Sequence, residues 1–142
     1  MTPKEYMLQY KLMKIWIKNL EEIIDNLRAE QDHVTSDMDG MPRGSDISDR
    51  TGELATQLAD IGMTLISMRA EAWRICIDIV NTISKVKEPE YVRLLHLRYI
   101  EMKTWDEISS EMHYSYQWVC TSLHSRALSE VGEILDRKKS NS

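Results

Sequence analysis

Apolar residues recur along two long stretches of this chain in alternating steps of four and three residues. In the first stretch the repeat falls on Tyr6, Tyr10, Met13, Ile17, Leu20, Ile24 and Leu27. In the second stretch it falls on Leu54, Leu58, Ile61, Leu65, Met68, Ala72, Ile75, Ile79, Thr82 and Val86. This spacing puts the repeating residues on one face of an α-helix, as in a coiled coil. The chain is therefore expected to contain two long helices, at about residues 3–30 and 52–87, each with an apolar seam.

The segment between these two helices has the composition of a loop. Residues 31–51 are polar and contain Gly40-Met41-Pro42-Arg43-Gly44-Ser45, which interrupts the helical pattern. Two long helices joined by a loop predict an antiparallel hairpin over residues 1–87. The hairpin has surplus apolar residues outside its seams, including Trp16 and Trp73. We expect this surplus either to form a homodimer or to pack on the rest of the chain, so that the hairpin serves oligomerisation or partner docking.

The composition favours an all-α fold. Among 142 residues there are three Pro, five Gly, nine Met and no Phe, which suits long helices with adaptable packing surfaces. The two cysteines, Cys76 and Cys120, are far apart and are expected to be reduced. Neither a secretory signal nor a membrane span is predicted, because charged residues interrupt every apolar stretch. We therefore expect a cytoplasmic protein.

Residues 88–135 are predicted to form three short helices after a break at Glu88 and Pro89. The expected inner-face residues are Val92, Leu95 and Tyr99 in the first helix, Trp105, Ile108, Ser109 and Met112 in the second, and Val119, Leu123, Ala127 and Val131 in the third. A short second helix followed by a longer third one is the arrangement of a helix-turn-helix. The remaining residues, 136–142, are basic and are expected to be a flexible tail.

Three positions have the residues that commonly start a helix. Thr2 and Glu5 form a capping box at the beginning of the first long helix, and Thr104 and Glu107 form another before the second short helix. Ser115 is placed to cap the third short helix. The sequence thus marks the start of the proposed recognition helix.

The outer face of this third helix carries side chains that are able to read DNA. At 100° per residue, the residues opposite the inner face are Gln117, Trp118, Thr121, Ser122 and Ser125. Gln can bind adenine bidentately, and Ser or Thr can bond to base edges or phosphates. The candidate phosphate contacts are Arg98, Lys103, Ser115, Arg126, Arg137, Lys138 and Lys139. An alternative for Trp118 is that its indole packs on a neighbouring helix.

Several motifs in this region resemble those of a known family. They are Leu95-x-Leu97-Arg98-Tyr99-Ile100-Glu101, Thr104-Trp105-Asp106-Glu107-Ile108, Tyr114-Ser115 and Leu123-His124-x-Arg126-Ala127-Leu128. These motifs resemble region 4 of sigma-70 factors and, more closely, the sigma-like ArpU and RinA regulators of phages and integrative elements of Gram-positive bacteria. The Gly40–Ser45 segment and the following Asp49-x-Thr51-Gly52 resemble a linker in such proteins, so the likeness spans nearly the whole chain.

The resemblance implies a bacterial regulator of late or packaging genes that binds promoter DNA and contacts RNA polymerase. Met102 and Ser125 stand where members of the family often have Gly, so the first turn is made without the residue that most readily adopts a left-handed backbone. The third helix also has few Arg and Lys residues for a sigma-like protein.

The charge distribution bears on how strongly such a module binds DNA. The net charge is −5, and residues 1–84 carry all of this acidic excess, because residues 85–142 have nine basic and nine acidic residues. A neutral module lacks much of the phosphate attraction on which DNA affinity depends. We therefore expect sequence-specific DNA binding that depends on a dimer or a partner.

Two other functions are kept open. One is a protein-interaction module that docks on RNA polymerase with little DNA contact, and the other is a packaging component like a small terminase. We expect neither an enzyme nor a bound cofactor, because no catalytic triad spacing or Gly-rich phosphate loop occurs. Cys120 and His124 lie four residues apart, but a metal site needs three or four ligands, so no metal is predicted.

Overall fold

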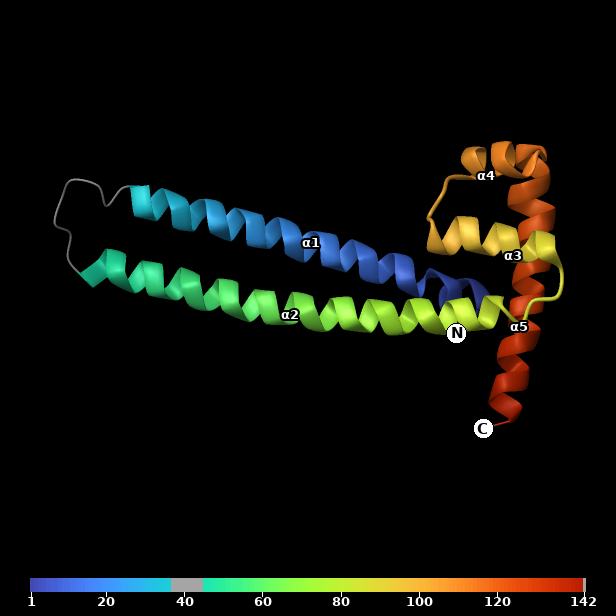
Figure 1. Cartoon of the computed structure of the whole chain (residues 1–142), viewed down its shortest axis with the longest axis horizontal. Coiled ribbons are helices and arrows are strands. Elements are labelled where there is room, and N and C mark those ends of the chain that lie inside the picture. Colours follow the sequence, from blue (N-terminus) through green and yellow to red (C-terminus); the bar gives the residue numbers. More distant parts are fainter. Residues whose placement is uncertain (37–44, 142) are drawn as a thin grey trace. The chain divides into compact units, whose positions relative to one another are not determined.

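The computed structural model of the chain describes residues 1–36 and 45–141. Every regular element in these residues is helical (Figure 1), so the all-α prediction is confirmed. The elements are α1 (Pro3–Ser36), α2 (Ser45–Ile83), α3 (Pro89–Leu95), the π-helical turn η1 (His96–Ile100), α4 (Trp105–Met112), the π-helical turn η2 (Trp118–Leu123) and α5 (His124–Ser140). No helix among the described residues is both long enough and apolar enough to cross a membrane.

The first long helix ends later than the sequence pattern indicated. Helix α1 continues to Ser36 rather than residue 30, because residues 31–36 are mostly polar but contain neither Gly nor Pro. Val34 is buried and extends the apolar repeat by seven residues, about two turns, beyond Leu27. Polarity alone was therefore a poor indicator of a loop.

The second long helix begins earlier than the sequence pattern indicates. Helix α2 begins at Ser45 rather than residue 52, and it ends at Ile83 rather than residue 87. Its C-terminus closes into a tight turn, in which the N–H of Lys85 donates to the Thr82 carbonyl at 3.1 Å. The predicted loop of residues 31–51 is correspondingly shorter, and Gly40–Gly44 of its motif lie outside the described residues.

The chain divides into two compact units, residues 14–71 and residues 1–13 together with 72–142. In the first unit α1 and α2 are linked by the ion pairs Glu21–Arg69 (2.8 Å) and Glu30–Arg50. The later residue of α1, Glu30, pairs with the earlier residue of α2, Arg50, so the two helices run antiparallel in this unit. The ion pairs are exposed and contribute little stability. The apolar seam contributes more, through its buried residues Ile17, Ile24, Val34, Leu54 and Leu65.

The second unit has one continuous hydrophobic core. The first turns of α1, the end of α2 and the turn that follows it supply Tyr6, Met7, Ile79, Ile83 and Val86. The rest of the core comes from Leu94, Leu95, Leu97, Tyr99, Ile108, Val119, Leu123, Ala127, Val131 and Ile134. The core therefore continues across residues 87 and 88, where the sequence pattern had suggested a domain boundary.

A buried hydrogen-bond group joins α1 to α2 in this unit. The Tyr6 hydroxyl lies 2.5 Å from the Asp78 carboxylate and 2.8 Å from the Thr82 hydroxyl. Burial and the neighbouring carboxylate raise the pKa of Tyr6 to about 12. The Lys138 ammonium group also bonds to Asp78, at 3.1 Å. Since α5 is helical to Ser140, the expected flexible tail is mostly the last turns of a helix.

Candidate nucleic-acid interface

A turn of three residues connects α4 to the next helix. Helix α4 ends at Met112, and His113 has a left-handed backbone with φ 60° and ψ 38°. The N–H groups of His113 and Tyr114 both donate to the Ser109 carbonyl, which closes the end of α4. Helical structure resumes at residue 116 and continues without a break through η2 and α5. We call residues 116–140 the third helix.

Both predicted caps around this turn are confirmed. The Thr104 hydroxyl oxygen accepts the N–H of Glu107 at 3.2 Å, at the start of α4. The Ser115 hydroxyl oxygen accepts the N–H of Trp118 at 3.2 Å, at the start of the third helix. Each bond satisfies one of the donors left free in a first helical turn. The side chains therefore fix where both helices begin.

The inner face of the third helix agrees with the prediction. Val119, Ala127 and Val131 are fully buried, and Leu123 is 2 % exposed. These side chains pack in the core with Leu94, Leu97 and Ile108 of the preceding elements. The packing fixes which face of the helix is turned outward.

The predicted base-reading residues lie on or beside the outward face. Gln117, Thr121 and Ser125 are exposed, Trp118 is 37 % exposed, and Ser122 is half-buried. The Thr121 hydroxyl donates to the Gln117 carbonyl within the helix. Between Glu111 and Glu130 the sequence has no carboxylate, so no side-chain acid on this part of the helix repels phosphate. The segment therefore offers a polar surface with little negative charge.

Trp118 contacts the side chain of Arg126. The guanidinium carbon of Arg126 lies 5.2 Å from the centre of the indole ring. This distance is in the range of a cation–π interaction. Trp118 thus has a partner on its own helix, and Arg126 is held beside the outward face.

The other predicted phosphate contacts are largely engaged within the protein. The Arg98 guanidinium donates to the Lys103 carbonyl at 3.0 Å and lies 4.3 Å from the centre of the Trp105 ring. Lys103 forms an ion pair with Glu111, and this bond raises the pKa of Lys103. Glu111 also pairs with Arg93 at 3.2 Å. The charge of Lys103 is therefore already paired with a carboxylate, whereas Arg98 is held by a backbone carbonyl and an aromatic ring.

The basic residues at the end of α5 do not join the outward face of the third helix. Arg137, Lys138 and Lys139 follow Arg126 by at least 11 residues, which is about 17 Å along a helix. Lys138 is paired with Asp78. The structure thus brings Trp118 and Arg126 together but leaves this basic cluster well apart from them.

One buried polar group was not anticipated. The Tyr99 hydroxyl and Nε2 of His124 are 2.5 Å apart, and the Trp105 ring meets the imidazole edge-on with centroids 4.7 Å apart. Burial, together with the smaller effect of the positive charges of Lys4 and Arg98, lowers the pKa of His124 to about 4. Burial likewise raises the pKa of Tyr99 to about 12. His124 is therefore neutral at neutral pH.

The sequence contained a signal for this group. His124 lies four residues after Cys120 and three before Ala127, which places it next to the inner face of the third helix. That spacing suggested only an incomplete metal site. Among the residues that the structure describes, no three His, Cys, Asp or Glu side chains gather as metal ligands would.

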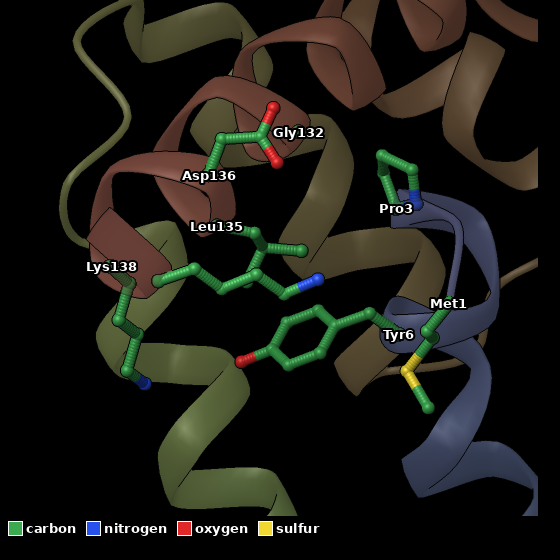
Figure 2. Close-up of a pocket in the computed structure, with 8 residues that line it drawn as sticks. Met1, Pro3, Tyr6, Gly132, Leu135, Asp136 and Lys138 are labelled. Carbon is green, nitrogen blue, oxygen red and sulfur yellow. The ribbon is translucent and has the colours of Figure 1, made fainter. Parts of the chain in front are cut away.

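Among the hollows between described residues of this unit are two that do not coincide with the outward face of the third helix. Figure 2 shows the larger, of about 450 Å³, between the first residues of the chain and α5. Met1, Pro3, Tyr6 and Leu135 are among its lining residues, and so is Lys138. The smaller, of about 140 Å³, is lined in part by Lys4, Arg98 and His124.

Comparisons of the chain with models of protein families, with curated proteins and with solved structures gave no match. A function for this chain is therefore inferred from its residues and their geometry.

Proposed function

We propose that this protein is a sequence-specific DNA-binding transcription regulator, in which α4 and the third helix act as a helix-turn-helix. The observation that carries the proposal is the three-residue turn at residues 113–115. It has a left-handed residue, where such turns often have Gly, and it leads into a capped helix with an exposed polar face. The resemblance to sigma-like regulators of phages supports control of late or packaging genes.

In this proposal the third helix enters the major groove by its first turns. Gln117 and Thr121 contact base edges, and Arg126, held beside Trp118, contacts a phosphate. The N-terminus of the helix adds a favourable partial charge for a phosphate. Lys103 and Lys138 contribute less, because each already has a carboxylate partner.

The test is selection of bound duplexes from a random or genomic pool, followed by titration of the selected duplex with variants. Gln117→Ala and Thr121→Ala should each lose about 1 to 3 kcal/mol of discrimination against the wrong base. Gln57→Ala and Thr56→Ala are matched controls, because they remove the same exposed residue types from α2. Selection of no common sequence, or unchanged discrimination in both third-helix variants, would refute the reading face.

The salt dependence of binding provides an independent measurement. Arg126→Ala should weaken binding to all duplexes and reduce the slope of log affinity against log salt by about one. Lys138→Ala should leave that slope nearly unchanged, because the Lys138 charge is paired with Asp78. If Lys138→Ala has the larger effect, the phosphates lie against the end of α5 and the proposed orientation is wrong.

We also propose that the protein acts as a homodimer through the unit of residues 14–71. Among the described residues of that unit, five large apolar side chains are at least 44 % exposed, namely Ile15, Trp16, Ile23, Met63 and Ile66. Exposed apolar side chains in such number commonly mark a protein interface. A dimer would double the DNA contacts of a module with little net charge. Sedimentation should give twice the chain mass, and Trp16→Gln should shift the equilibrium toward monomer.

The second candidate is an interaction module that docks on RNA polymerase and makes little DNA contact. It is favoured by the ion pairs that match Arg93 and Lys103 with Glu111. Co-purification with polymerase, together with no measurable duplex binding, would select it. Ring-sized oligomers in light scattering would instead favour the packaging component.

A further inference from the structure

The smaller cavity of the second unit has an unusual distribution of charge. It has a volume of about 140 Å³ and lies against the first turn of α1, η1, the start of α4 and the third helix. Two of its lining residues, Lys4 and Arg98, carry positive charge at neutral pH, and none of its lining residues is Asp or Glu. The cavity therefore has two cations around it and no acid of its own.

The positive charges of Lys4 and Arg98 also act on His124, the buried residue that lines the cavity. The charges of Lys4 and Arg98 both lower the pKa of His124, which lines the cavity and is 9 % exposed. An anion in the cavity would be attracted by both cations in surroundings that are partly screened from water.

The cavity also has the size and the walls of a small-anion site. Its volume corresponds to roughly four or five water molecules at about 30 Å³ each, which is enough for a tetrahedral oxyanion. The Arg98 guanidinium is held in place by its bond to the Lys103 carbonyl and by the Trp105 ring. A guanidinium fixed in this way loses little freedom when it binds an oxyanion.

We propose that this cavity binds a phosphate group, which Lys4 and Arg98 hold by charge-assisted hydrogen bonds beside Tyr99, Trp105 and His124. The phosphate is either a free ion or a phosphate of nucleic acid. The site is separate from the proposed reading face, because Gln117, Thr121 and Ser125 do not line the cavity. The inference therefore does not depend on the proposed DNA-binding function.

The test uses the indole N–H signals of the full chain in a nuclear magnetic resonance titration. Trp105 lines the cavity, whereas Trp16 and Trp73 do not, so they serve as references within the same sample. Inorganic phosphate is added at pH 7, and sodium chloride at equal ionic strength corrects for screening. The Trp105 signal should shift saturably with a dissociation constant on the order of 1 mM, and the reference signals should not.

Variants decide whether the cavity cations are responsible. Lys4→Gln should weaken phosphate binding about tenfold, as expected for the loss of one charge-assisted hydrogen bond. Lys11→Gln, an exposed lysine on the same helix that does not line the cavity, should leave it unchanged. Lys4 is itself exposed and not in the core, so its variant is expected to fold.

A parallel titration with a short DNA duplex identifies the source of the phosphate. A Trp105 shift that free phosphate reverses would assign the site to nucleic acid, and the absence of that shift would assign it to a free phosphate. Equal shifts with phosphate and chloride would overturn the proposal. So would equal phosphate affinity in the parent and in Lys4→Gln.

Discussion

The contact between α5 and the start of α1 gives a prediction whose sign is set by the structure. A Cβ added at Gly132 would lie 3.0 Å from Cγ of Pro3, whereas a Cβ added at Gly62 would meet nothing within 4 Å. Both glycines are inside helices. Gly132→Ala and Gly62→Ala therefore make the same chemical change, and only one of them meets an obstacle.

The expected free energies follow from two opposing effects. Replacing Gly by Ala inside a helix stabilises it by about 1 kcal/mol, and this should be the whole effect at Gly62. At Gly132 the pyrrolidine ring has to move by several tenths of an ångström, and such overpacking costs about 1 to 3 kcal/mol. Gly132→Ala should therefore be neutral or destabilising, and the two variants should differ by about 1 to 3 kcal/mol.

Urea and thermal unfolding followed by circular dichroism measure this difference. Each kcal/mol should correspond to about 2 to 4 °C in Tm for a chain of this size. Pro3→Ala removes Cγ, so Gly132→Ala should become stabilising in that background, as in a double-mutant cycle. If Gly132→Ala alone stabilises as much as Gly62→Ala, the first turn of α1 does not pack on α5 as described.

Three further predictions concern residues around the third helix. Tyr99→Phe should lower the free energy of unfolding by about 1 to 3 kcal/mol, because Nε2 of His124 loses its buried partner, and Tyr114→Phe, which removes an exposed hydroxyl, should cost less than about 0.5 kcal/mol. Because the folded state holds the pKa of His124 at about 4, against an ordinary value of 6.5, the unfolded state binds the proton more readily between these values. Stability contributed by His124 should therefore be full above pH 6.5 and fall by up to about 3 kcal/mol as pH drops to 4, a slope that His124→Gln should remove in urea unfolding at several pH values. Met102→Gly should raise the unfolding free energy by about 0.5 to 1 kcal/mol, since Met102 has φ 59°, and equal stability in Met102→Ala and Met102→Gly would contradict this reasoning.

The caps and the apolar repeats were predictable because they depend on residues close together in the sequence. The capping box of Thr2 and Glu5 is present, with the Thr2 N–H donating to the Glu5 carboxylate at 2.8 Å and the Glu5 N–H donating to the Thr2 hydroxyl oxygen at 3.1 Å. The inward face of the third helix was equally accessible, since its buried residues are one turn apart. Short-range rules of this kind also predicted the all-α fold.

The ends of the long helices were less predictable. The mostly polar residues at 31–36 are compatible with both a loop and an exposed helical turn, and the structure continues the helix to Ser36 with Val34 buried. Met102 stands where proteins of the resembled family often have Gly. Its backbone has the left-handed φ that Gly adopts most readily, although the residue is not Gly.

The sequence by itself determined that the fold is all-α, where several of the helices begin and which face of the third helix is apolar. Only the tertiary structure decided that Met7 and Ile79 share a core with Leu94, that Lys138 is matched by Asp78, and that Tyr99 and His124 bond to each other. The physical reason is distance along the chain. Periodicity and capping act over one or two helical turns, whereas these contacts join residues 15 to 87 positions apart and form only when helices pack.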